Sequence, residues 1–162
     1  MGDKSMVRLM PTEEYFALVR QALATDGKAY VRVTGNSMRP LLRHLKDGVV
    51  IVPPDHLRAG DIVLFDRGNG RFALHRVIRL DENGFSMAGD NQSILETGLP
   101  YAGIVGIVDV IDRGGRKLSR DGFIFKNYAR LLTSCAMPRI YIRRDLGKLL
   151  RLFGRRPISK GK

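Results

Sequence analysis

The sequence is poor in cysteine and histidine, and this scarcity removes several kinds of site. Cys135 is the single cysteine among 162 residues. No internal disulfide can therefore form, and a lone cysteine points to a reducing compartment. The three histidines, His44, His56 and His75, are too few to build a Cys/His zinc site with it. Carboxylate ligands are left open by this argument, but we predict no metal and no cofactor.

Long hydrophobic runs are also missing. The longest apolar stretch is residues 101–108, whereas a membrane-spanning helix needs about 20 apolar residues. The first 16 residues contain no apolar core of signal-peptide length. We therefore expect the protein to stay on the side of the membrane where it is made, in the cytoplasm.

Acidic residues are scarce only in the last third of the chain. Residues 1–112 hold 13 basic and 14 acidic side chains, whereas residues 113–162 hold 15 basic and two acidic ones. The net charge of +12 thus comes from a basic C-terminal extension. Such an extension can bind nucleic acid or an anionic membrane surface, or can simply keep the protein in solution.

Apolar residues make up 44% of the chain, enough to bury a core. Residues 12–26 are predicted to form a helix that Thr12 caps and Gly27 ends, with Phe16, Val19 and Leu23 on its packed face. Short strands separated by turn residues follow, which is typical of a curled antiparallel β body. The predicted strands are Ala29–Thr34, Gly48–Val52, Asp61–Asp66, Arg71–Leu80, Gly84–Ala88 and Ala102–Asp112.

Helix is predicted again from Leu118. One apolar stripe combines Phe123, Tyr128, Leu131, Leu132 and Cys135, and Pro138 ends that helix. A second amphipathic segment, Ile140–Phe153, sets leucines against arginines and lysines. It can lie in a membrane interface, or it can cover the β body with its basic face in water. The fold class is therefore mainly β, with an N-terminal helical segment, a β domain and a basic helical extension at residues 1–27, 28–117 and 118–162.

Ser37 is the first candidate for chemistry. It follows a predicted strand and the flexible Gly35, and Pro40 redirects the chain after it. A serine in this position can present its hydroxyl at the edge of a sheet, but it needs a base in contact to become a nucleophile. The alternative is an ordinary turn serine.

His75 is the natural partner for that serine. It lies in an otherwise apolar predicted strand, and an imidazole can accept and return a proton near neutral pH. Asp90, or Glu96 six residues further on, could fix the tautomer of such a histidine. The alternatives are a structural histidine in the strand and an Asx turn at Asp90.

These residues lie in four segments that occur in order: Ser37-Met38-Arg39-Pro40, Gly60–Phe65, His75-Arg76-Val77 and Gly89-Asp90-Asn91. Together the segments resemble the ordered boxes of type I signal peptidases, over roughly residues 31–110. His75 stands where the bacterial enzymes carry their general-base lysine. In this the chain resembles the archaeal and endoplasmic-reticulum branch, which uses Ser and His, whereas LexA-type repressors share the fold but use a Ser–Lys dyad.

The resemblance implies a serine endopeptidase that removes a leader or signal segment from a precursor peptide or protein. Ser37 would attack, His75 would act as base and then acid, and Asp90, or alternatively Glu96, would orient His75. The backbone N–H of Ser37 would help hold the oxyanion, with Asn36 or Thr34 replacing the hydroxyl residue that the family carries at the position of Gly35. Met38 and the strand containing Ile62 would line a shallow apolar cleft.

The chain departs from this family by carrying no membrane anchor. Its basic C-terminal helix would dock it on an anionic membrane, or its substrate is not a translocated preprotein. Two other functions remain open: a LexA-like regulator that binds nucleic acid, and a binding module without turnover. We expect no nucleic-acid partner, because the 28 residues before the first strand hold one predicted helix and a DNA-reading helix pair needs more.

Overall fold

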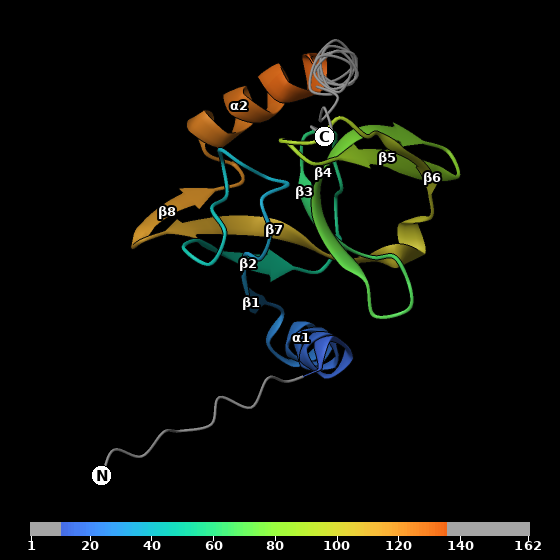
Figure 1. Cartoon of the computed structure of the whole chain (residues 1–162), viewed down its shortest axis with the longest axis vertical. Coiled ribbons are helices and arrows are strands. Elements are labelled where there is room, and N and C mark those ends of the chain that lie inside the picture. The colour runs from blue at the N-terminus through green and yellow to red at the C-terminus, as the bar shows by residue number, and fades with distance from the viewer. Residues whose placement is uncertain (1–10, 136–162) are drawn as a thin grey trace, which may run out of the picture.

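The computed structural model describes residues 11–135 (Figure 1). Eight strands form one antiparallel sheet in the order β1-β2-β7-β3-β4-β5-β6, with β8 paired to β7. The mainly β prediction is therefore confirmed. The strands are β1 Ala29–Arg32, β2 Gly48–Val52, β3 Ile62–Asp66, β4 Phe72–Asp81, β5 Gly84–Ala88, β6 Glu96–Leu99, β7 Ile104–Arg113 and β8 Arg116–Ser119.

The sheet buries both of its faces around β3. Ile62 and Leu64 belong to one hydrophobic cluster, and Val63 and Phe65 belong to another. Successive side chains of a strand point to opposite faces, so an uninterrupted apolar run is what a strand buried on both sides requires. The strands β6 and β8 were not predicted, because they are four residues long and mostly exposed.

The N-terminal helix α1, Thr12–Asp26, has the predicted bounds. Val19 and Leu23 are buried, and the ring of Phe16 stacks on Phe72 of β4 with centroids 3.6 Å apart. Gly27 ends the helix in the left-handed conformation, with φ 67°. The expected cap is wrong: Pro11 occupies the capping position, and Thr12 already lies inside the helix.

The second helix, α2 Phe123–Ser134, differs from its prediction in where it begins and in which face it buries. It starts five residues after Leu118, because that leucine lies in β8. Its buried residues are Phe125 and Ala129, whereas Phe123 is 83% exposed and Leu131 is 60% exposed. The predicted apolar stripe of Phe123, Tyr128, Leu131, Leu132 and Cys135 is therefore wrong.

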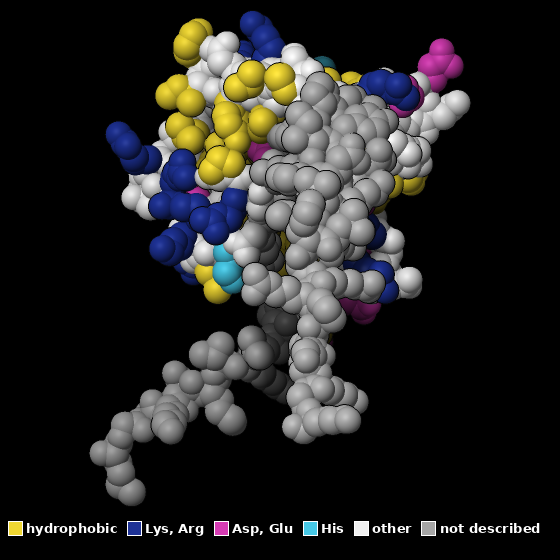
Figure 2. Space-filling view, turned by 45° about the horizontal axis from the view of Figure 1, so that its top comes forward, with side chains coloured by type: hydrophobic (Ala, Val, Ile, Leu, Met, Phe, Trp, Pro, Cys, Tyr) yellow, Lys and Arg dark blue, Asp and Glu magenta, His cyan; other side chains and the backbone are white. Residues whose placement is uncertain are grey.

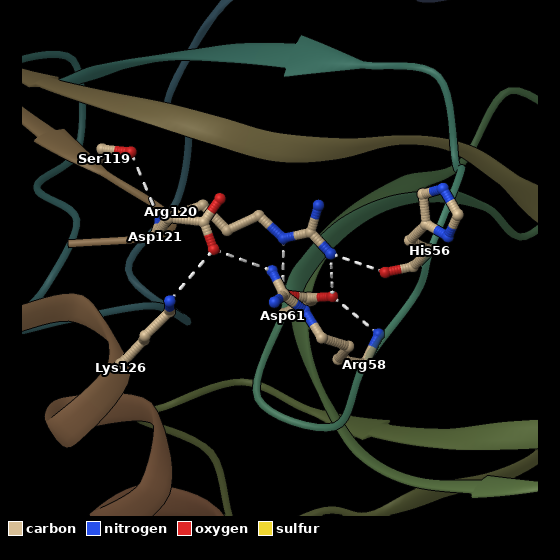
Figure 3. Close-up of polar contacts among 7 residues, drawn as sticks. All are labelled: His56, Arg58, Asp61, Ser119, Arg120, Asp121 and Lys126. Atoms are coloured by element: carbon tan, nitrogen blue, oxygen red, sulfur yellow. Dashed lines mark hydrogen bonds and ion pairs between the residues drawn. The ribbon is translucent and has the colours of Figure 1, made fainter. Parts of the chain in front are cut away.

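The start of α2 is fixed to the sheet by a buried ion pair (Figure 3). The guanidinium of Arg120 donates to both carboxylate oxygens of Asp61, at 2.8 and 2.6 Å, and to the carbonyl of His56. Asp61 also accepts from the backbone N–H of Arg58. These contacts join the end of β8 to the segment that leads into β3.

The described residues share cores across the three predicted segments. Val19 of α1 and Phe125 and Ala129 of α2 lie in the same cluster as residues of the sheet, and β8 crosses the expected boundary after residue 117. The predicted segment Ile140–Phe153 lies outside the described residues. Neither helix within residues 11–135 is long and apolar enough to cross a membrane.

Candidate active site

Ser37 lies in the turn-rich loop between β1 and β2 and is half-buried. Gly35 begins the turn with φ 91°, a conformation that residues with a Cβ rarely adopt. The N–H of Gly35 donates to Nδ1 of His44 at 2.8 Å, across the loop. Within residues 36–42, the carbonyls of Asn36 and Met38 accept backbone bonds from Arg39 and Leu42. The loop is thus held by its own contacts on both sides of the serine.

Two of the residues expected to bind substrate are in the core instead. Met38 is 2% exposed and Ile62 is fully buried. Both side chains belong to the cluster that supports the serine loop and β3. Their expected place in an open cleft is corrected: they support the loop and strand from below.

The serine loop is attached to the segment after β5. The N–H of Asn91 donates to the carbonyl of Ser37 at 2.6 Å, and the side-chain amide of Asn91 donates to the carbonyl of Asn36 at 3.3 Å. A Cβ built on Gly89 would lie 2.8 Å from the Ser37 carbonyl oxygen. Glycine at position 89 therefore permits the close approach of the two segments.

His75 lies in the middle of β4 and is buried. Its Nδ1 lies 2.8 Å from Oε1 of Glu96, the first residue of β6. An ionised carboxylate can only accept, so the proton of a neutral His75 is on Nδ1 and its Nε2 carries the free lone pair. This is the tautomer that a general base needs.

Two groups around His75 act on its charge in opposite directions. Burial lowers the pKa of His75 below its usual value, and the nearby cation of Arg67 lowers it further. The Glu96 carboxylate opposes both through its charge and its hydrogen bond. Arg67 donates to the same Oε1 at 2.6 Å, so it competes with the histidine for that oxygen. The net effect keeps the imidazole neutral and able to accept a proton near neutral pH.

Asp90 is occupied elsewhere. Its two oxygens accept from Nε and Nη2 of Arg76 at 2.8 and 2.7 Å, and both side chains are buried. Arg76 also donates to the carbonyl of Gly60, and its guanidinium lies 5.7 and 5.5 Å from the ring centroids of Phe125 and Tyr128 in α2. The expected contact of Asp90 with the ring of His75 is therefore corrected: the carboxylate on Nδ1 is that of Glu96.

Within residues 11–135, Ser37 and His75 are linked only through other residues, without a hydrogen bond between their side chains. The link runs from the Ser37 carbonyl through Asn91 to Asp90, whose charge acts on His75, and on to Arg76, the next residue along β4.

Comparison with known families assigns the chain to a family. Residues 2–109, two thirds of the chain, match the family model described as Peptidase S24-like. The chain belongs to the Peptidase S24-like family. No curated protein and no solved structure matches it.

The S24-like family lies in the superfamily of LexA and the signal peptidases, and some of its members are non-catalytic. The superfamily indicated by the four ordered segments is confirmed, whereas the Ser–His branch stays a prediction. The matched range includes Ser37, His75, Asp90 and Glu96, and it ends before α2.

Three residues around this S24-like site were not singled out from the sequence. Asn91 lies in the fourth ordered segment without a predicted role, and neither Arg67 nor His44 was assigned to the site. His44 is exposed, but its ring holds Gly35. No local pattern marks Arg67, because its partner Glu96 is 29 positions away. In the described part of the chain, no three His, Cys, Asp or Glu side chains are grouped to hold a metal ion.

Proposed function

We propose that this S24-like protein is a serine endopeptidase in which Ser37 is the nucleophile, His75 the general base and Glu96 the residue that orients His75. The observation that supports it best is the contact between Nδ1 of His75 and Glu96, which leaves Nε2 as a proton acceptor. A neutral imidazole with a free Nε2 can serve as the base that a nucleophilic serine needs.

The reaction proceeds in two steps. Oγ of Ser37 bonds to the carbonyl carbon of the scissile peptide as its proton moves to Nε2 of His75. The tetrahedral intermediate then collapses, the C–N bond breaks, and the imidazolium returns the proton to the leaving amine. Water hydrolyses the acyl-enzyme in the same way. The mechanism requires the Ser37 hydroxyl to lie within hydrogen-bond reach of Nε2 of His75 when substrate is bound.

The oxyanion would be held by backbone N–H groups of the serine loop. The N–H of Ser37 is the first of these. Gly35 cannot supply a hydroxyl, and its N–H already donates to His44. Asn36 has an exposed side chain and is our candidate for the second donor, with Thr34 as the alternative. One such donor is worth about 10²-fold or more in rate.

The substrate would be an extended segment of a precursor peptide or protein. β1 ends the strand order of the sheet, and it leads directly into the serine loop. Val33 exchanges backbone bonds with Asp47 and Leu45, so in an antiparallel pattern the backbone groups of Arg32 and Thr34 face away from β2. An extended peptide can pair with that edge. A cavity of about 350 Å³ adjoins it, lined by residues of α1, β1, β3 and β4.

The test uses purified protein and a library of peptides derived from whole-cell proteins, with cleavage read by mass spectrometry. Wild-type protein should cleave a defined set of peptides. Ser37→Ala should remove that cleavage while its melting temperature stays close to wild type, and His75→Ala should also remove it. Thr25→Ser, a conservative change at an exposed position of α1, serves as the control. Cleavage that persists unchanged in Ser37→Ala contradicts the proposal.

A second candidate function is a binding module without turnover. The observation that favours it is the missing hydrogen bond between Ser37 and His75 among the described residues. Under this alternative the wild-type protein cleaves nothing, and a serine-directed acylating probe leaves Ser37 unmodified. Its nucleic-acid form additionally predicts a salt-dependent mobility shift of duplex DNA.

A further inference from the structure

The outward face of α2 exposes three large apolar side chains. Phe123 is 83% exposed, Ile124 67% and Leu131 60%. At 100° per residue they lie within about 100° of one another on the helix surface. The opposite face is already packed, since Phe125 and Ala129 are in the core. The outward residues therefore have no core to enter, and an exposed apolar patch of this kind marks an interaction site.

The same helix carries only positive charge. Lys126 and Arg130 are exposed and lie on one flank of the apolar face, and no acidic residue occurs between residues 123 and 135. Apolar side chains gather on the upper part of the surface in Figure 2, where α2 lies, and Lys and Arg side chains border them. The nearby Asp121 is already paired with Arg58 and Lys126, as Figure 3 shows.

We propose that this face of α2 docks the protein on an anionic lipid bilayer. Phe123, Ile124 and Leu131 enter the boundary between headgroups and acyl chains, and Arg130 and Lys126 contact anionic headgroups. Apolar and basic residues arranged in this way are the two features that hold a helix in the plane of a charged membrane. The buried Arg120–Asp61 pair at the root of α2 keeps this face directed outward.

Charge favours the bilayer over two other occupants. A second copy of the chain would place Lys126 and Arg130 of both copies around one patch, where like charges repel. The segment 140–153 of this chain holds four basic residues and the single acidic Asp145, so its net charge has the same sign as that of the helix. An anionic bilayer matches both features: its acyl region accommodates the apolar patch, and its headgroups pair with the basic border.

The decisive experiment is co-sedimentation of the full chain with vesicles. Vesicles of phosphatidylcholine with about one third phosphatidylglycerol should bind the wild-type protein, and pure phosphatidylcholine should bind it weakly. The variant Phe123→Ser/Ile124→Ser/Leu131→Ser should bind the anionic vesicles at least about tenfold less well. Leu18→Ser is the matched control, because Leu18 is 51% exposed on α1 and should leave binding unchanged.

The charge contribution has its own pair of variants. Arg130→Gln should weaken binding to anionic vesicles about fivefold and leave binding to neutral vesicles unchanged. Lys28→Gln removes one exposed positive charge between α1 and β1 and should have no effect.

Three results would overturn the proposal. The first is equal vesicle binding by the wild type and the triple serine variant. The second is a wild type that is dimeric by light scattering and a triple variant that is monomeric but still binds vesicles. The third is a marked fall in the melting temperature of the triple variant with vesicle binding unchanged, which would mean that the face packs within the protein instead of on a bilayer. Vesicle binding does not depend on the peptidase, so Ser37→Ala should bind like the wild type whichever function the site has.

Discussion

His75 and Arg76 are neighbours in β4, yet they face opposite sides of the sheet and have different surroundings. Arg76 and Asp90 form a two-bond ion pair whose side chains are 0% and 1% exposed. His75 meets Glu96, whose side chain is 21% exposed and is shared with Arg67. One carboxylate thus completes a closed structural pair, whereas the other leaves an imidazole nitrogen free.

The strand register explains which carboxylate meets which cation. Arg76 is paired with Ala88, and Asp90 lies two residues after Ala88, on the same face as Arg76. Val77 is paired with Met87, which in turn is paired with Glu96. Partners across strands share a face, so Glu96 lies on the face of Val77 and therefore of His75. The comparison predicts that Glu96 serves chemistry and Asp90 serves stability.

The largest effect we expect is the loss of activity in Glu96→Gln. An amide in place of the carboxylate no longer enforces the Nδ1–H tautomer or stabilises the imidazolium, so kcat/KM should fall by roughly 10²- to 10⁴-fold. The readout is hydrolysis of a peptide that wild-type protein cleaves, with the melting temperature measured beside it. Activity within about twofold of wild type would place the orienting role elsewhere.

Asp90→Ala should act mainly on stability. It leaves Arg76 charged and unpaired in the core, and the free energy of unfolding should fall by about 3–5 kcal/mol, measured by urea denaturation. The double variant Arg76→Met/Asp90→Leu, which removes both charges, should recover much of that loss. If Asp90→Ala unfolds like the wild type but loses activity, the division of roles between the two carboxylates is wrong.

The sequence alone could not predict which of the two carboxylates, Glu96 or Asp90, contacts His75. The alternation and turn residues predicted six strands and α1 well, because apolar patterning and glycine act locally. Placing Glu96 beside His75 requires β6, and nothing in the exposed segment Glu96–Leu99 marks it as a strand. The buried face of α2 was mispredicted for a related reason: Phe125 and Ala129 pack on a partner, the sheet with Arg76, that only the fold supplies.

Gly89→Ala tests the close contact between the serine loop and the segment after β5 that carries Asp90. A Cβ at position 89 meets the Ser37 carbonyl at 2.8 Å and the Gln92 side chain at 2.9 Å, so the serine loop must shift. A displacement of this kind can cost about 10²-fold in kcat. The measurement is kcat at saturating peptide. The control is Ser86→Ala, a buried position on β5 that pairs with Arg79 of β4, and it should retain most of the wild-type kcat.

Arg67→Gln is the finest test, because it changes the charge beside His75 without touching the histidine. Arg67 lowers the pKa of His75, so its removal raises that pKa toward or above the usual 6.5, and Glu96 is then free to bind the ring alone. The base works only when neutral, so the acid limb of kcat/KM should move to higher pH. Activity should fall at about pH 6 and stay unchanged at about pH 8. Arg71→Gln, on the same turn but outside this contact, should leave the profile in place. If the acid limb moves to lower pH instead, the variant has lowered the pKa of His75. Arg67 would then act by positioning Glu96 and not through its own charge, because a weakened Glu96 contact is the remaining way to lower that pKa.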